Sequence, residues 1–328
     1  TVWAMKAGKD VYCEKPACYN IHEGQVVVQT AHDTQRMVQV GSQHRSTPFK
    51  INGMKLIKDG IIGKVYMSKG LCYKRRVSIG HKENQPTPAG VNWDLFLGPA
   101  PMRPFNELRF KYNWHWFWDT GNGDIGNQGV HEMGLARWAM GDPAWPKTAI
   151  SYGGKYGPDD DQETPNTQTA AFDFGGRQLV FEVRGGLTGS EGSTPPPGKN
   201  APPRTSPEIH PMTGNLVYGT EGWMSMSDAG FQIYKGEGSE LVTEEKASGG
   251  DQTKAHMENF LGVVRSRKYA DLHDGIENAV LSAGLVHLAN ISYRSGHKLT
   301  LDNGPKFVGD AEANKLITRP VYRKGYEV

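Results

Sequence analysis

The stretch Asp10-Val11-Tyr12-Cys13-Glu14-Lys15-Pro16 is a strand-like run that ends in a charged turn. A lysine at the carboxyl end of a strand in an open α/β sheet lies where such sheets bind ligands and carry out chemistry. The stretch therefore predicts an α/β fold, and it makes Lys15, with Glu14 and Pro16 beside it, a candidate for a ligand site. Taken alone, a solvated lysine is the competing interpretation.

The sequence after this stretch completes a strand, helix, strand unit. Asn20 and Glu23 have the spacing of a capping box and predict a helix over Ile21 to Thr34. A buried strand over residues 37–41 follows. The two strands are therefore expected to be parallel, with a right-handed crossover.

Polar side chains leave both of these strands at one rim. Lys15 follows the first strand, while Gln43 and Arg45 follow the second. Ligands bind outside the carboxyl ends of the strands in open α/β sheets. The pattern predicts that these three side chains line a common crevice.

Length and composition are those of a globular chain. The 328 residues predict roughly two domains, and 22% charged residues with a formal charge of +2 point to neither nucleic acid nor a membrane surface as a partner. No apolar stretch approaches the ~20 residues of a membrane helix. Cys13, Cys18 and Cys72 have no metal-binding spacing, so we expect no metal site and no disulfide. The sequence begins at Thr1 with a helix end capped by Gly8, which indicates a fragment or a processed chain.

From residue 49 onward, strands follow one another without intervening helices, which predicts a largely antiparallel sheet. The fold class expected for the whole chain is thus α/β (α+β overall). The segment of about 185–215 is dense in Gly, Pro, Ser and Thr and is expected to be a long loop, either a lid or disordered. The other elements expected are a helix over 51–59, a strand over 64–70, a hairpin of 169–174 with 178–183, strands between 214 and 234, and helices over 256–265 and 274–293.

Residues 114–131 are the segment richest in residues that can carry chemistry. Glycines at 121–126 match G-x-G-x-x-G, but no buried strand precedes them and no acid ends a following strand, so a phosphate-binding loop is not favoured. We prefer a glycine turn feeding a helix, with Asn127 and His131 four residues apart on one face. Histidine exchanges protons near neutral pH, whereas an amide can only orient its partners. A partly buried histidine satisfied by a backbone carbonyl is the alternative.

Further polar and aromatic residues could line the same cleft. The run Tyr73-Lys74-Arg75-Arg76 follows the first strand of the second domain and could reach into the cleft, although a solvated charge run is the more common explanation. The aromatic residues of 114–118 could stack on a sugar face or pack in the core. The candidates for substrate contact are Lys74, Arg75, His115, Trp116 and Asp124, to which His210 is added on residue type alone.

Three motifs in order carry a resemblance. Glu14-Lys15-Pro16, then Val40-Gly41 followed by Arg45, then the glycine turn into Gly129-Val130-His131 resemble the Gfo/Idh/MocA family, which includes glucose-fructose oxidoreductase and inositol dehydrogenase. The resemblance covers nearly the whole chain but begins at the fifth strand of the family's Rossmann domain, so that on the order of a hundred residues would be missing. It implies that 1–48 are the remnant of that domain and that 49–328 form the substrate and oligomerisation domain.

The resemblance implies hydride transfer between NAD or NADP and a sugar, polyol or related cyclic hydroxyl compound, in an enzyme that self-associates through its second sheet. Family members use the lysine of Glu-Lys-Pro, an aspartate, and a histidine four residues later. Lys15 and His131 match, and Asn127 stands where the aspartate is expected. The residues expected at the cofactor are Glu14, Lys15, Pro16, Gln43 and Arg45.

Two alternatives stay open at this point. Some relatives cleave glycosidic bonds through transient oxidation by NAD, and Asn127 in place of aspartate is compatible with such a reaction. The other alternative is a non-catalytic domain that serves assembly or ligand binding, which the missing phosphate-binding loop supports.

Overall fold

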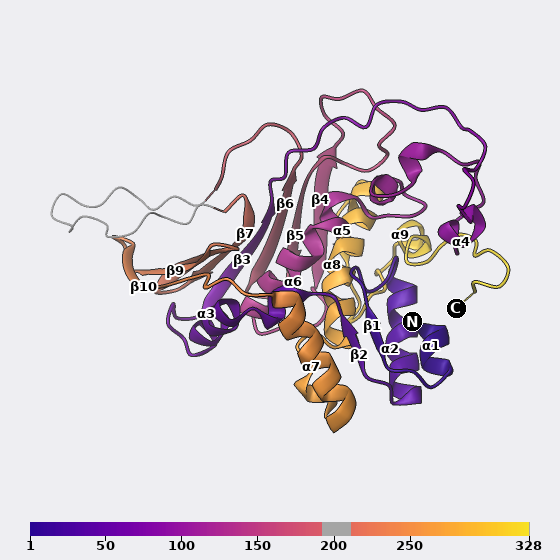
Figure 1. Ribbon diagram of the computed structural model, residues 1–328. Coiled ribbons are helices and arrows are strands. Elements are labelled where there is room, and N and C mark those ends of the chain that lie inside the picture. Colours follow the sequence, from indigo (N-terminus) through magenta and orange to yellow (C-terminus); the bar gives the residue numbers. More distant parts are fainter. Residues whose placement is uncertain (192–210, 328) are drawn as a thin grey trace.

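The computed structural model describes residues 1–191 and 211–327 and shows a mixed α/β chain with two sheets (Figure 1). One sheet has two strands and lies near the N-terminus, and the other has nine strands. The predicted fold class is therefore confirmed. Most of the predicted loop of about 185–215, and His210 with it, lies outside the described residues.

The two-stranded sheet forms as the sequence predicts. The chain runs through α1 (Val2–Lys6), β1 (Val11–Cys13), α2 (Ile21–Thr34) and β2 (Val38–Val40), and β1 pairs with β2 in parallel. Asn20 Oδ1 accepts the Glu23 N–H at 2.8 Å, and the Glu23 carboxylate accepts the Tyr19 N–H at 3.3 Å. These side chains satisfy backbone donors that the start of a helix leaves without partners, which fixes where α2 begins.

The nine-stranded sheet has the order β10-β9-β8-β7-β3-β6-β5-β4-β11. All neighbours are antiparallel except β3 and β6, which run in parallel with Gly70 opposite Phe181. The strands are β3 (Val65–Cys72), β4 (Thr148–Gly154), β5 (Thr167–Asp173), β6 (Gln178–Arg184), β7 (Thr213–Gly219), β8 (Gly222–Ser227), β9 (Gly230–Lys235), β10 (Glu240–Lys246) and β11 (Leu299–Thr300). The largely antiparallel sheet is confirmed, and β7 begins within the predicted loop.

The predicted hairpin is present as β5 and β6. Gly175 and Gly176 have φ of 76° and 88°, a backbone region that side chains rarely adopt. Strands β7, β8 and β9 likewise follow where strands with glycine turns are expected. These turns are local features, so the sequence alone identifies them.

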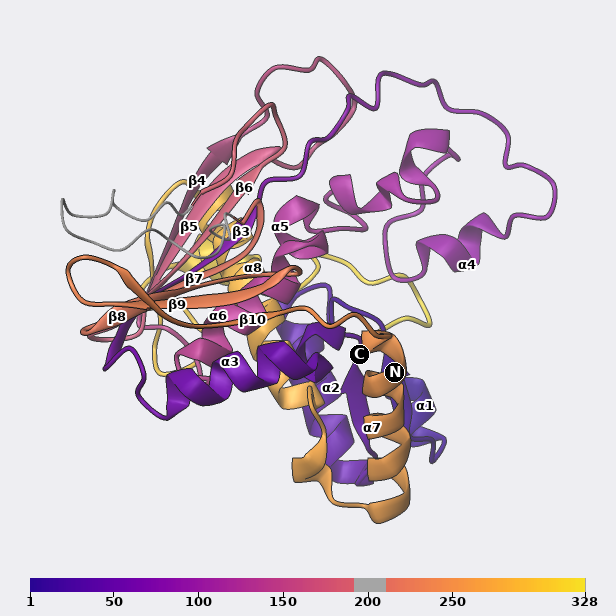
Figure 2. The same cartoon turned by 60° about the vertical axis from the view of Figure 1, so that its left-hand side comes forward.

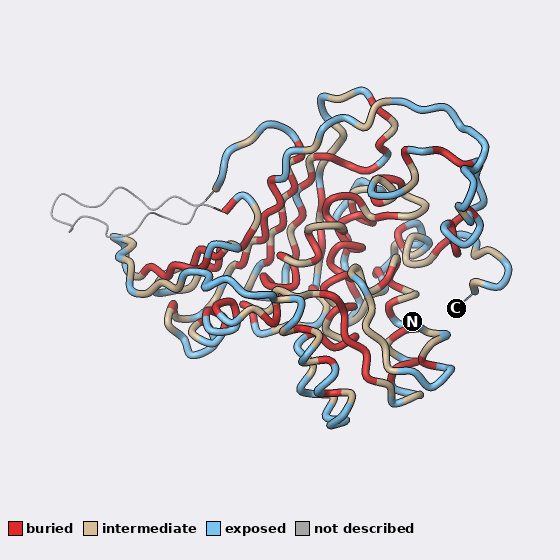
Figure 3. The backbone as a smooth tube through the Cα atoms, in the orientation of Figure 1, coloured by how far each residue is buried: buried red, intermediate tan, exposed pale blue. Residues whose placement is uncertain are grey.

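The helices of the second part cover one face of the sheet. α6 contacts β3 and β7, and α8 contacts β4, while the long segment that carries α4 extends away from the sheet (Figures 1 and 2). Figure 3 shows the buried backbone concentrated in the strands and in α6 and α8. The helices are α3 (Pro48–Lys58), α4 (Trp93–Leu97), α5 (Gly123–Asn127), α6 (Gly129–Ala139), α7 (Gln252–Ser266), α8 (Ile276–Ser295) and α9 (Ala311–Lys315), with 3-10 turns η1 (Gln43–Ser46), η2 (Glu107–Arg109), η3 (Asn113–Trp116) and η4 (Tyr269–Asp271).

Two glycines allow α6 to approach the sheet closely. A Cβ added at Gly70 of β3 would lie 2.7 Å from the Phe181 ring, and one added at Gly129 would lie 2.9 Å from the same ring. Real Cβ atoms essentially never come this close to another heavy atom. Glycine at both positions therefore sets the corner between α5 and α6 directly over the centre of the sheet.

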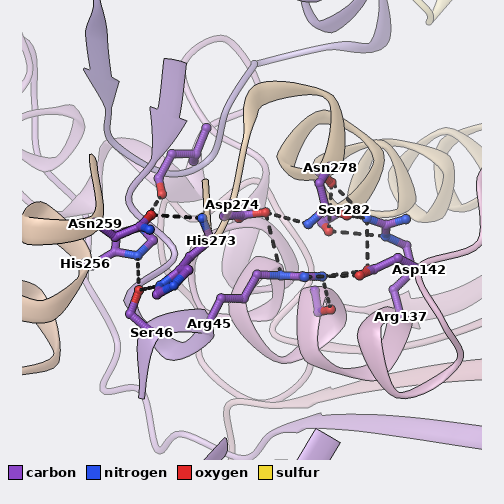
Figure 4. A network of polar contacts seen from close by, with 12 residues as sticks. Arg45, Ser46, Arg137, Asp142, His256, Asn259, His273, Asp274, Asn278 and Ser282 are labelled. Atoms are coloured by element: carbon purple, nitrogen blue, oxygen red, sulfur yellow. Dashed lines mark hydrogen bonds and ion pairs between the residues drawn. The ribbon is translucent and has the colours of Figure 1, made fainter. Parts of the chain in front are cut away.

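A buried ion network joins the small sheet to α6 and α8 (Figure 4). Arg45 is 7% exposed, and its Nη2 donates to Asp142 Oδ1 at 2.6 Å and to the Gly134 carbonyl at 3.0 Å. Its Nε lies 3.6 Å from Oδ1 of the buried Asp274. The guanidinium thus connects η1, the end of α6 and the start of α8.

A second part of the network connects η1 to α7. His256 Nε2 donates to the Val40 carbonyl at 2.8 Å, so its Nδ1 accepts the Ser46 hydroxyl at 2.5 Å. Ser46 Oγ in turn accepts from His273 Nδ1 at 2.6 Å. Each polar group here has a defined donor or acceptor, as buried polar groups require.

In the ranges that the structure describes, none of the helices is both long enough and apolar enough to cross a membrane.

We expect Arg45→Met to lower the free energy of unfolding by roughly 3–5 kcal/mol, because Asp274 then remains buried without its nearest cation. Urea denaturation measures this change. Arg265→Met is the matched control: Arg265 is exposed on α7 and has no ion pair in the described part of the chain, so the expected change is under ~0.5 kcal/mol. Equal stabilities of the two variants would contradict the role of the network.

Candidate functional site

The candidate site forms where the turn after β1 meets the corner between α5 and α6. Lys15 Nζ donates to the Asn127 carbonyl at 2.6 Å and to Asn127 Oδ1 at 2.9 Å. The sequence predicted one helix that carries both Asn127 and His131, but the structure has two short helices that meet at Gln128. The His131 N–H bonds to the Gln128 carbonyl instead of that of Asn127, which leaves the Asn127 carbonyl to Lys15.

The surroundings of Lys15 make it easier to deprotonate than a solvated lysine. Burial lowers the pKa of Lys15 below its ordinary value, and the charges of Lys74 and Arg76 act in the same direction. The carboxylates of Glu14 and Glu132 oppose this shift. A lysine ammonium has three donors, and two of them bond to Asn127, so one N–H is left for a ligand.

His131 is one helical turn further along and is uncharged at neutral pH. Burial lowers its pKa well below the ordinary value, and the neighbouring basic groups of His44 and Lys15 lower it further. Its Nδ1 is buried and has no hydrogen-bond partner among the described residues. The alternative was a histidine whose ring is hydrogen-bonded to a backbone carbonyl. Among the described residues, no carbonyl forms such a bond with Nδ1.

The Asn127 side chain is held in place on its far side by Tyr112, which sequence reasoning missed. Asn127 Nδ2 donates to Tyr112 Oη at 3.1 Å and lies 3.4 Å from His115 Nε2. Tyr112 Oη also accepts from Arg76 Nη1 at 3.1 Å. These contacts fix the amide so that its oxygen faces Lys15.

Asp124 and Trp116, both expected to contact substrate, lie in a packed layer beside this amide. Asp124 is 1% exposed, and its Oδ1 accepts from Arg76 Nη2 at 2.6 Å while its Oδ2 accepts from Trp116 Nε1 at 3.1 Å. His115 is also buried, which lowers its pKa. The rings of His115 and Trp116 pack edge-on against Tyr112, with centroids 4.8 and 6.1 Å away, and Arg76 links Asp124 to Tyr112 Oη.

The basic run after β3 divides between the site and solvent. Lys74 Nζ donates to the Gln128 side chain, and Arg76 reaches Asp124, whereas exposed Arg75 donates only to the Arg76 carbonyl at 3.0 Å. Alternate residues of an extended chain point to opposite sides. Arg76, which belongs to the predicted run but was not among the candidates for substrate contact, therefore lies where Arg75 was expected.

Glu132 and His44 also lie at the site and were missed. Glu132 is 1% exposed, and burial raises its pKa to about 7. Gln128 Nε2 donates to both of its oxygens, at 3.1 and 3.2 Å. The ring of His44 lies 5.1 Å from that of His131. The sequence held one signal for each: Glu132 directly follows His131, and His44 lies between Gln43 and Arg45.

The residues predicted to hold a cofactor separate into two groups. Glu14, Lys15, Pro16 and Gln43 follow β1 and β2 at their carboxyl ends, and Gln43 Nε2 donates to Tyr12 Oη at 3.3 Å. Arg45 is instead directed into the buried network of Figure 4.

The glycines of 121–126 serve packing. A Cβ at Gly121 would lie 2.2 Å from His115 Cα. Across the described ranges, no group of three or more His, Cys, Asp or Glu side chains is arranged to hold a metal ion.

A nicotinamide group fits the chemistry of this corner on two observations. The one N–H of Lys15 without an acceptor and the unpartnered Nδ1 of His131 lie beside the carboxyl ends of β1 and β2. Ligands of open α/β sheets bind at such strand ends. The free donor and acceptor atoms of the described residues at this corner are thus compatible with a bound nicotinamide and a hydroxyl compound.

Solved structures share this fold. The aldose-aldose oxidoreductase from Caulobacter crescentus, solved with glycerol, has a TM-score of 0.61 at 15% identity, over 92% of this chain and 74% of that one. The WlbA dehydrogenase from Bordetella pertussis, solved with NADH and UDP-GlcNAcA, has a TM-score of 0.59 at 16% identity, over 92% and 74%. An oxidoreductase from Agrobacterium radiobacter, solved with NAD+, L-tartaric acid and magnesium, has a TM-score of 0.58 at 14% identity, over 91% and 75%.

No curated protein matches the sequence significantly. The family model for an oxidoreductase family, C-terminal α/β domain, of the Gfo/Idh/MocA type matches residues 49–148 and 226–328. These ranges make up more than half of the 328 residues. The chain belongs to the Gfo/Idh/MocA oxidoreductase family.

Proposed function

We propose that the protein transfers a hydride between NAD or NADP and a sugar, polyol or related cyclic hydroxyl compound. The observation that carries this proposal is the pair of hydrogen bonds from Lys15 to Asn127, with the unpartnered Nδ1 of His131 one turn away. An imidazole that is uncharged at neutral pH, and an amine whose pKa is lowered by burial, can accept the proton of a substrate hydroxyl. Family membership and the fold shared with NAD(H)-bound structures support the same conclusion.

Each residue of the site has a defined part in this reaction. A bound nicotinamide supplies the hydride acceptor or donor. Lys15 or His131 takes the hydroxyl proton, since both have pKa values below their ordinary ones. Asn127, fixed by Tyr112, orients Lys15 through its carboxamide oxygen. It cannot exchange a proton itself, so the lysine and the histidine must carry the acid-base work.

Self-association through the large sheet is part of the proposal. Leu71, Tyr73 and Leu216 form a separate apolar cluster with Tyr218 and Trp223, distinct from the core under α6 and α8. Leu71, Tyr73 and Leu216 are buried, whereas Tyr218 and Trp223 are partly exposed and present aromatic surface beside them. Exposed aromatic side chains on a sheet face are typical of interfaces between subunits.

If this face is the interface, Trp223→Glu should shift sedimentation toward the monomer. Leu261→Glu, at an exposed apolar residue of α7 outside the large sheet, is the comparison. Identical sedimentation of both variants and the unaltered protein would contradict the proposed interface.

We expect Lys15→Met and His131→Ala each to lower turnover by at least ~100-fold, because each removes a group that exchanges the hydroxyl proton. Binding of NADH or NADPH, measured by fluorescence titration, should stay nearly the same. The matched controls are Lys58→Met, an exposed lysine of α3, and His81→Ala, an exposed histidine, which should keep full turnover. Unchanged turnover in both site variants would contradict the proposed acid-base roles of Lys15 and His131. Cleavage of a glycoside without net formation of NADH would favour the glycosidase alternative.

The Asn127→Asp variant tests the electrostatic role of this position. A carboxylate beside Lys15 would favour the ammonium form and raise the Lys15 pKa, opposing the effect of burial. If neutral Lys15 is the base for oxidation, the pH at which the rate of oxidation reaches half its maximum should rise by roughly one to three units. Asn127→Gln, which adds no charge, is the control. A pH profile of Asn127→Asp that coincides with the original profile would exclude Lys15 as the base.

A further inference from the structure

A row of titratable side chains leads from the buried side of the site to the surface. Oε1 of Glu132 lies 3.9 Å from Nδ1 of His44, and Nε2 of His44 lies 3.6 Å from Oδ1 of Asp228. The side chains are 2%, 12% and 72% exposed, in that order. They come from α6, η1 and the turn between β8 and β9, so only the folded chain brings them together.

His44 is the residue of this row that can both take and release a proton. One imidazole nitrogen can accept a proton while the other gives one up, and here each nitrogen faces a different carboxylate. Nδ1 is buried and has no hydrogen-bond partner among the described residues. Both separations exceed hydrogen-bond length, so a small ring rotation or a bridging water is needed to close each step.

The charges around the row place a protonated acid next to a neutral imidazole. Burial raises the pKa of Glu132 to about 7, which Gln128 and Lys50 oppose. Burial lowers the pKa of His44 to about 4; Lys50 and Lys74 add to this shift and Asp228 opposes it. Near neutral pH, Glu132 can therefore hold a proton that it can lose again without a large change in pH.

Lys50 keeps the outer end of the row in position. Its ammonium is 3% exposed and donates to Asp228 Oδ1 at 2.7 Å. The second oxygen of Asp228 is left for solvent, because the side chain is largely exposed. The lysine thus orients Asp228 toward His44.

We propose that Glu132, His44 and Asp228 form a path that carries the proton released by hydroxyl oxidation from the site to solvent. This inference rests on the proposed function. Oxidation breaks one C–H and one O–H bond of the substrate: the hydride, with both electrons, goes to the nicotinamide, and the proton is left on Lys15 or His131. Since the His131 ring lies 5.1 Å from that of His44 and Glu132 interacts with the charge of Lys15, either residue is placed to pass the proton on. In the reductive direction the path supplies the proton.

Chemical rescue tests the path in the whole enzyme. We expect His44→Phe to lower turnover at least ~10-fold, and we expect added imidazole to restore it, because a small buffer can replace a missing proton carrier but cannot repair a folding defect. His81→Phe, at an exposed histidine outside the row, should show neither the loss nor the rescue. An unchanged rate in His44→Phe, or a loss that imidazole does not restore, would overturn the proposal.

A titration by NMR tests the coupling without any activity. The imidazole resonance of His44 should show a small step near pH 7, which reports the ionisation of Glu132, and Glu132→Gln should abolish this step. Asp228→Asn should lower the pKa of His44 further, since Asp228 stabilises the charged ring. A His44 resonance without a step near pH 7 would show that Glu132 and His44 are not coupled. These results stand even if no oxidoreductase activity is found, so a failure of the path and a failure of the proposed function can be told apart.

Discussion

The hydrogen bonds between Lys15 and Asn127 bring together two parts of the chain that are far apart in sequence. One partner follows the parallel strands of the small sheet, and the other ends α5 over the centre of the large sheet. For the ammonium group to reach the Asn127 carbonyl, α5 and α6 must be separate helices and α6 must lie close to β3. Gly129 and Gly70 permit that approach by leaving space for the Phe181 ring.

Buried cations recur in this region, and each has its own set of acceptors. Arg45 is paired with Asp142 and lies beside Asp274, and Lys50 is paired with Asp228. Lys15 differs, because its acceptors are the uncharged oxygens of Asn127. A cation without a directly paired anion is more easily deprotonated, so an uncharged amide at position 127 does not oppose the lowering of the Lys15 pKa by burial.

The parts of the fold that depend on local chemistry follow from the sequence. The capping side chain of Asn20 fixes the start of α2, and the two glycines between β5 and β6 fix their hairpin. The direction of Arg45 could not be predicted, because its acceptors belong to α6 and α8 and become neighbours only on folding. The same holds for Glu132 and His44, whose proximity depends on how η1 packs against α6. That Arg76, and not Arg75, reaches the site could have been foreseen, because successive side chains of an extended chain point to opposite sides.

Hydride transfer from the substrate to the nicotinamide can be followed with an isotope label. The protein would be incubated with NAD+ or NADP+ and a panel of sugars and polyols deuterated at the carbons that bear hydroxyl groups. The mass of the nicotinamide product would then be measured by mass spectrometry. We expect a reduced cofactor that is heavier by one deuterium. Reduced cofactor without the label, or product formed with the deuterium still on its original carbon, would contradict hydride transfer from the substrate.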